Sequence, residues 1–205
     1  MKNKNLNIDL INIPLINLRI ECRRIYDFWL SSELDKILTE RNPISLNTGS
    51  MIIVAEPYEL ITATLQRCLL GLETYVQSAA QSAYISRHPN GCYSWNTFPR
   101  VHEITEEKRL AAKLYKSIPK LVDENLSLAY MDNGLYQWLL HFYKNIRNPI
   151  FHGMQIQKVN GDDLRSIAME VAKVYRWIDS WYEPHQAFQP VRLNPAIFLF
   201  PNPDT

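Results

Sequence analysis

The spacing of apolar residues constrains this chain most, because it repeats every three to four positions over long stretches. The longest stretch begins at Pro57, and its apolar and small residues share one helical face: Ile61, Leu65, Cys68, Leu69, Leu72, Val76 and Ala83. A stripe with this period predicts an amphipathic helix, and a proline suits its first turn. We therefore expect a long central helix that starts near Pro57.

The segment before this helix has the same spacing over residues 15–38, which predicts another helix. Its apolar face changes at Trp29–Leu30, so we expect a bend there or burial on two sides. A polar stretch at 41–50 then interrupts the chain. No stretch alternates convincingly with period two, although residues 51–55 are apolar enough for one short strand.

Three further helices are expected in the second half of the chain. The third helix should open at Thr105, where acidic residues follow a residue of the N-cap type. It runs through Leu114, and Pro119 should kink or split it. The fourth should begin near Asp132 and the fifth near Gly161, both with nearly ideal apolar stripes.

Together these segments predict an all-α fold, a helical bundle of about five helices. The bundle should cover residues 15–183, after an extended or disordered arm at 1–14. A long loop at 86–103 and a proline-rich extended tail at 184–205 complete this division. The apolar patch Ala196–Phe200 in the tail should pack on the bundle or on a second subunit.

Composition limits the functions that the chain can have. The 205 residues carry a formal net charge of +1, so a broad basic face for nucleic acid is not expected and any RNA contact must be local. The cysteines at 22, 68 and 92 form no CxxC pair, and the first two fall on apolar helical faces as reduced thiols. Asn and Asp interrupt the apolar runs of the first twenty residues, so we expect no membrane span and a cytoplasmic protein.

The junction between the fourth and fifth helices, YKNIRNPIFHG, carries the candidate site. Asn148 precedes a proline, which disfavours helical backbone angles and should end the fourth helix. Pro149 can then open a fresh turn with Asn148 as its N-cap. Arg147 and His152 would lie on the two sides of this break, where their side chains can converge on one groove.

This pair of residue types suits cleavage of RNA without a metal. Histidine can take or give a proton near neutral pH, and arginine presents a planar cation that matches phosphate oxygens. RNA carries its own nucleophile, the 2′-hydroxyl. A base that removes its proton and a cation that stabilises the phosphate would be sufficient. Lys144, one turn before Asn148, is a candidate for a further phosphate contact, although a solvated lysine is the favoured interpretation.

The residues from Arg147 to His152, with the polar Asn148 directly after the arginine, resemble the R-x4–6-H motif of the HEPN superfamily. The resemblance implies a helical bundle, usually dimeric, in which two motifs meet in a shared cleft. Many such families are metal-independent ribonucleases of toxin–antitoxin, abortive-infection or CRISPR systems. By this resemblance Arg147, Asn148 and His152 are catalytic, RNA is the substrate and an antitoxin protein is a partner. Met154 stands where a subgroup neutralised by AMP transfer has tyrosine, which argues against that kind of antitoxin.

Simpler interpretations stay open beside this hypothesis. Arg147 can cap carbonyls at a helix end, Asn148 can be a cap alone, and His152 can be a loop residue bonded to a carbonyl. The runner-up function is therefore a catalytically silent HEPN-like module that binds a nucleotide or a protein. A DNA-binding regulator is weaker, since no basic recognition helix stands out.

No cofactor and no metal are expected, since His88, Cys92 and His102 do not form a convincing ligand set. The same loop interleaves cations with aromatic residues, as surfaces for single-stranded nucleic acids do, although packing of these aromatics against the bundle is the favoured explanation. The tryptophans at 29, 138, 177 and 181 are interpreted as core or dimer-interface anchors.

Overall fold

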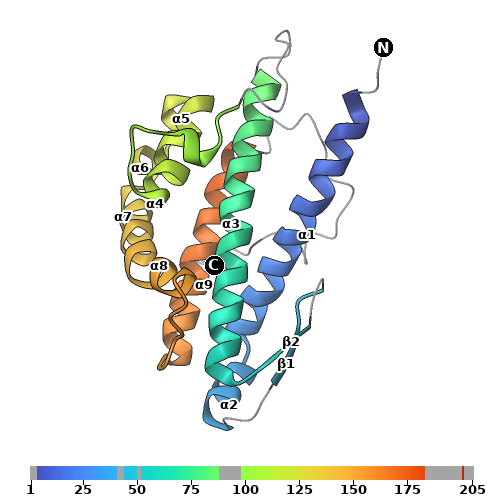
Figure 1. The fold of residues 1–205 in the computed structure, drawn as a ribbon, viewed down its shortest axis with the longest axis vertical. Coiled ribbons are helices and arrows are strands. Elements are labelled where there is room, and N and C mark those ends of the chain that lie inside the picture. The colour runs from blue at the N-terminus through green and yellow to red at the C-terminus, as the bar shows by residue number, and fades with distance from the viewer. Residues whose placement is uncertain (1–3, 41–43, 50–51, 88–97, 183–199, 201–205) are drawn as a thin grey trace.

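The computed structural model describes residues 4–40, 44–49, 52–87, 98–182 and 200, and it is predominantly helical (Figure 1). The long helix α3 (Pro57–Arg87) lies at the centre, as the apolar stripe predicts, and it packs against α1 (Lys4–Leu30) and α9 (Gly161–Tyr182). The predicted face of α3 is buried, with Ile61, Leu65 and Val76 at most 1% exposed. The all-α fold class is confirmed.

A layer of short helical pieces covers the side of α3 that faces away from α1 (Figure 1). In chain order the layer consists of α4 (Leu110–Ala112), η2 (Lys113–Ser117), α5 (Ile118–Val122), η3 (Glu124–Leu126), α6 (Leu128–Met131), α7 (Asn133–Phe142), η4 (Tyr143–Arg147) and α8 (Asn148–Phe151). Asp132 caps α7, because its carboxylate accepts a hydrogen bond from the backbone N–H of Leu135 at 2.9 Å. The fourth and fifth predicted helices thus begin where the sequence places them.

The third predicted helix begins later than expected. Residues 104–109 are not helical, and α4 starts at Leu110 instead of Thr105. The extended backbone buries Ile104, 7% exposed, and lets the Glu107 carboxylate pair with the ammonium of Lys116 on η2. These tertiary contacts outweigh the helix-start signal of the acidic residues. The short helix η1 (Val101–Glu103) precedes this segment.

Near the N-terminus the helix is longer than predicted, because α1 already includes residues 4–14, where the sequence predicts an extended arm. The predicted bend is present: α1 ends at Leu30, and α2 (Glu33–Glu40) follows after Ser31 and Ser32. The predicted strand is β2 (Ile52–Ala55). Its antiparallel partner β1 (Ile44–Asn47) lies in the stretch that the polar composition marks as a loop.

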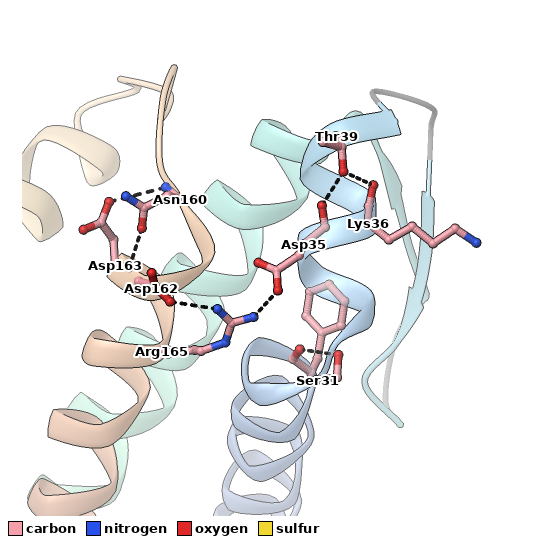
Figure 2. Close-up of polar contacts among 9 residues, drawn as sticks. Ser31, Asp35, Lys36, Thr39, Asn160, Asp162, Asp163 and Arg165 are labelled. Carbon is pink, nitrogen blue, oxygen red and sulfur yellow. Dashed lines mark hydrogen bonds and ion pairs between the residues drawn. The ribbon is translucent and has the colours of Figure 1, made fainter.

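Figure 2 shows how α9 is fixed against α2. The guanidinium of Arg165 pairs with Asp162 on its own helix, at 3.0 Å, and with Asp35 on α2. Asn160 caps α9, because its side-chain oxygen accepts a hydrogen bond from the backbone N–H of Asp163 at 2.8 Å (Figure 2). The contact between Arg165 and Asp35 connects helices that lie 130 positions apart in the chain.

Aromatic and charged groups complete the core between α1, α3 and α9. Phe200 is 6% exposed and stacks on Tyr175, with ring centroids 4.2 Å apart, so this one residue of the predicted apolar patch packs on the bundle. The fully buried Arg19 forms an ion pair with Asp179 at 2.5 Å and a hydrogen bond to the Tyr75 hydroxyl at 2.6 Å. Residues 196–199 lie outside the described part.

The predicted anchors and thiols agree with the structure where it describes them. Trp29 and Trp177 are buried, and Trp138 is partly buried and stacks on Phe142. Cys22 and Cys68 are buried free thiols. The side chain of Trp181, and all of Cys92, lie outside the described residues. Among the described helices, none combines the length and the apolar character needed to cross a membrane.

Candidate functional site

The motif lies within a continuous helix, which corrects the prediction that the chain breaks at Asn148. Asn148 has φ −64° and ψ −47°, and its backbone N–H donates to the carbonyl of Tyr143, five residues earlier. The π-helical turn η4 therefore joins α7 directly to α8. A π-turn widens the helix just before Pro149, whose missing N–H and bulky ring disrupt the ordinary α-helical ladder.

His152 occupies the C-cap of this helix. The N–H of Gly153 donates to the carbonyl of Ile150 at 3.1 Å, and the N–H of Met154 donates to the carbonyl of Pro149 at 3.0 Å. These two bonds form a Schellman motif, which requires a left-handed residue at the position after the cap. Gly153 supplies it with φ +87°. The motif exposes the His152 side chain at the end of α8, and its ring has no hydrogen-bond partner within the described residues.

Arg147 points to the central helix instead. Its Nε and Nη2 donate to the two carboxylate oxygens of Glu73 on α3, at 3.0 and 3.2 Å. Both side chains are largely buried, with Arg147 17% and Glu73 14% exposed. The guanidinium also covers the ring of Phe151, 4.0 Å from its centroid, an arrangement that favours the cation. Nη1 contacts Asn148 Oδ1 at 3.5 Å.

A pocket of about 500 Å³ opens beside the motif helix. The described residues that line it come from two segments, the start of α4 and the helix α7–η4–α8: Lys108, Arg109, Leu110, Ala111, Leu140, Tyr143, Lys144, Asn148 and His152. Figure 1 shows both segments on the same side of α3. None of these described lining residues is acidic, so the pocket suits an anionic ligand.

The structure thus brings three of the four predicted site residues to one pocket and leaves one outside it. Lys144, Asn148 and His152 line the pocket, whereas Arg147 is not among its described lining residues. The expectation that the arginine and the histidine share one groove is wrong for this conformation. The reason is Glu73, which lies 74 positions earlier in the chain and attracts the guanidinium to α3.

Lys108 and Arg109 are pocket residues that the sequence analysis missed. The sequence places them in the first turns of a helix expected from Thr105. The adjacent basic pair directly before an apolar helix start was the available signal. Their place beside the motif depends on the contact of α4 with α7, which joins segments distant in sequence.

Tyr143 links the pocket to the core. Its hydroxyl shares a hydrogen bond of 2.8 Å with the Tyr115 hydroxyl, and both tyrosines are buried. Burial raises the pKa of Tyr143 well above its usual value, and Tyr115 and Glu73 nearby add to the shift. Burial likewise raises the pKa of Tyr115. Tyr143 therefore keeps its proton at neutral pH. Glu73 contacts both ends of η4, Tyr143 at its start and Arg147 at its end.

Of the loop at 86–103, the structure describes residues 86–87 and 98–103. His88, Cys92, Tyr93 and Trp95 lie outside the described residues, and His102 is exposed on η1. In the part of the chain that the structure describes, no group of histidine, cysteine and acidic side chains could hold a metal ion.

Comparison with protein-family models, curated proteins and solved structures gives no match to this chain.

Proposed function

We propose that the protein is a metal-independent endoribonuclease of the HEPN type. One observation carries the proposal: His152, which has no hydrogen-bond partner within the described residues, lies in a pocket that is also lined by the cationic side chains of Lys108, Arg109 and Lys144. A general base beside a cluster of cations is what cleavage of a phosphodiester by its own 2′-hydroxyl requires. The motif resemblance points to the same chemistry.

In the proposed reaction the imidazole of His152 takes the proton of the ribose 2′-hydroxyl. The 2′-oxygen then forms a bond to phosphorus while the bond from phosphorus to the 5′-oxygen breaks. The protonated imidazole returns a proton to the departing 5′-oxygen. The products are a 2′,3′-cyclic phosphate and a 5′-hydroxyl, and no metal or other reactant is consumed.

The cations act by stabilising the charge on the phosphate. Lys144 lines the pocket and is exposed, so it can contact a phosphate oxygen as the structure stands. Arg147 has to release Glu73 before its guanidinium can contact a phosphate oxygen directly. While it is bound to Glu73, it orients Asn148 through Nη1. As a ribonuclease of this type, the protein would form a homodimer through the motif face, act in the cytoplasm and have a cognate antitoxin as partner.

Cleavage of a labelled RNA in excess EDTA tests this function. We expect the wild type to produce cyclic-phosphate ends, and His152→Ala to cleave about 10²- to 10⁴-fold more slowly, the usual contribution of a general base. His102→Ala is the matched control, because this histidine is also exposed but does not line the pocket. Cleavage by His152→Ala at the wild-type rate contradicts the mechanism.

A second candidate function is a catalytically silent module that binds a nucleotide or a protein. The bidentate ion pair between Arg147 and Glu73 favours it, because it engages the guanidinium that the family motif assigns to the phosphate. The same assay separates the two candidates. A wild type that binds RNA in EDTA but leaves it intact, across several RNAs, would favour the silent module.

A further inference from the structure

The basic pair Lys108–Arg109 is held in a defined position beside the pocket. On its N-terminal side Ile104 is buried in the core, and the Glu107 carboxylate is paired with Lys116. On its C-terminal side Ala111 is buried at the start of α4. The segment is therefore anchored at both ends, while the two basic side chains between the anchors are exposed and line the pocket.

The pocket is larger than a single phosphate needs. Its volume of about 500 Å³ lies in the range of sites that hold drug-sized ligands. Cations line it from two separate segments: Lys108 and Arg109 before α4, and Lys144 on η4. Leu110, Leu140 and Tyr143 contribute apolar surface, on which a ribose or a base can pack. Charge from two segments and apolar surface in one pocket suit a ligand with phosphates and a nucleoside.

We infer that Lys108 and Arg109 form a second phosphate subsite, which binds the phosphate next to the scissile one in single-stranded RNA. The inference rests on the proposed function, because it assigns the scissile phosphate to the His152 segment. Arginine and lysine together can engage several oxygens of one phosphate, the arginine through its planar fork. A near-neutral chain with a net charge of +1 would thus hold RNA through a local site.

The subsite should make the efficiency of cleavage depend on the length of the substrate. A dinucleoside monophosphate has only the scissile phosphate, so it cannot engage Lys108 and Arg109 while it is cleaved. A trinucleotide carries the neighbouring phosphate. We therefore expect the trinucleotide to be cleaved with a higher kcat/KM than the dinucleoside monophosphate, and expect Lys108→Gln/Arg109→Gln to remove this difference.

Binding of a labelled single-stranded oligodeoxynucleotide, which lacks the 2′-hydroxyl, tests the subsite without cleavage. Each phosphate contact contributes about 0.7 to the slope of log affinity against log salt on single strands. Losing the one phosphate that Lys108 and Arg109 bind should lower the slope by about 0.7, which corresponds to a roughly eightfold loss of affinity at 50 mM relative to 1 M salt. Lys36→Gln/Lys120→Gln is the matched control, since both lysines are exposed and neither lines the pocket.

The outcomes separate this inference from the ribonuclease proposal. A lower slope in the pocket variant alone supports the subsite, even where the wild type leaves RNA uncut, which would overturn only the proposed function. Equal losses in both double variants, or no oligonucleotide binding by the wild type, overturn the subsite. Full displacement of the oligonucleotide by an equal concentration of phosphate groups supplied as inorganic phosphate also overturns it, because the site would then recognise a single phosphate.

Discussion

Glu73 has an unusual position for a carboxylate, since it lies on the central helix and meets two residues of the same π-turn. It accepts both hydrogen bonds from the Arg147 guanidinium and stands beside the Tyr143 hydroxyl. A partly buried charge without a partner is costly. The pair of Glu73 and Arg147 therefore orients η4 on α3. The orientation of η4 in turn positions the side chains of Lys144 and Asn148, which line the pocket.

We expect Glu73→Gln to lower the free energy of unfolding by about 1–3 kcal/mol, because it leaves the largely buried guanidinium of Arg147 without a counter-charge. Urea unfolding followed by circular dichroism measures the change. Glu170→Gln is the control: Glu170 pairs with Lys173 within one helix, at 2.9 Å, and such a pair contributes roughly 0.3–0.5 kcal/mol. Equal stability of Glu73→Gln and the wild type would mean that the ion pair contributes nothing.

Individual site residues could be predicted only where the signal was local. The arginine, the asparagine and the histidine stand within six positions, and their types alone suggest phosphate chemistry. Glu73 could not be found in this way, because nothing in its own helix distinguishes it from a solvated acid. Lys108 and Arg109 were missed for the same reason: their function depends on which segment α4 packs against.

At the scale of the element, the two π-turns of the described residues end at the same distance before a proline. η2 ends at Ser117 before Ile118–Pro119, and η4 ends at Arg147 before Asn148–Pro149. A proline inside a helix removes one hydrogen bond and pushes against the carbonyl four residues earlier. The wider turn accommodates it without ending the helix. The sequence rule that the residue before proline leaves helical angles failed at Asn148 because the continued helix keeps its tertiary contacts.

The end of α8 depends on a single glycine. Gly153 has φ +87°, and a Cβ built there would meet no atom within 4 Å, so any cost of a side chain comes from the backbone alone. We expect Gly153→Ala to lower the free energy of unfolding by about 1 kcal/mol, measured by urea unfolding. It should also lower RNA cleavage, because His152 is the preceding residue.

Gly134→Ala serves as the control for this substitution. Gly134 lies in the first turn of α7, and a Cβ added there would lie 3.3 Å from Asp132 Oδ1. The higher helix propensity of alanine offsets this close contact. Its stability should stay within about 0.5 kcal/mol of the wild type. A loss at Gly134 that equals the loss at Gly153 would contradict the assignment of the Schellman motif.

For the whole molecule, the apolar stripes were enough to predict the fold class, the central helix and the starts of the fourth and fifth helices. They work because burial of one face stabilises a helix whatever its partners are. The apolar stripes could not predict the β1–β2 hairpin or the late start of α4. Both depend on pairings between residues that are separate in the chain, such as Ile44 with Ala55 and Glu107 with Lys116.

The buried tyrosines of this core make the stability of the whole bundle sensitive to alkaline pH. Tyr115, Tyr143 and Tyr175 are each at most 3% exposed, and burial raises the pKa of all three hydroxyls in the folded state. The unfolded chain releases these protons near pH 10, whereas the folded protein retains them. Their contribution to stability is therefore complete below pH 10 and decreases as the pH rises further.

We expect the free energy of unfolding to fall above pH 10 by about 1.4 kcal/mol per pH unit for each tyrosine that stays protonated only in the folded state. Urea unfolding at a series of alkaline pH values measures this slope, and Tyr115→Phe should reduce it by the contribution of one tyrosine. The absorbance of tyrosinate gives an independent readout, because the buried hydroxyls should ionise together with unfolding. Ionisation of all tyrosines while the helical signal is intact would show that the core is open to hydroxide.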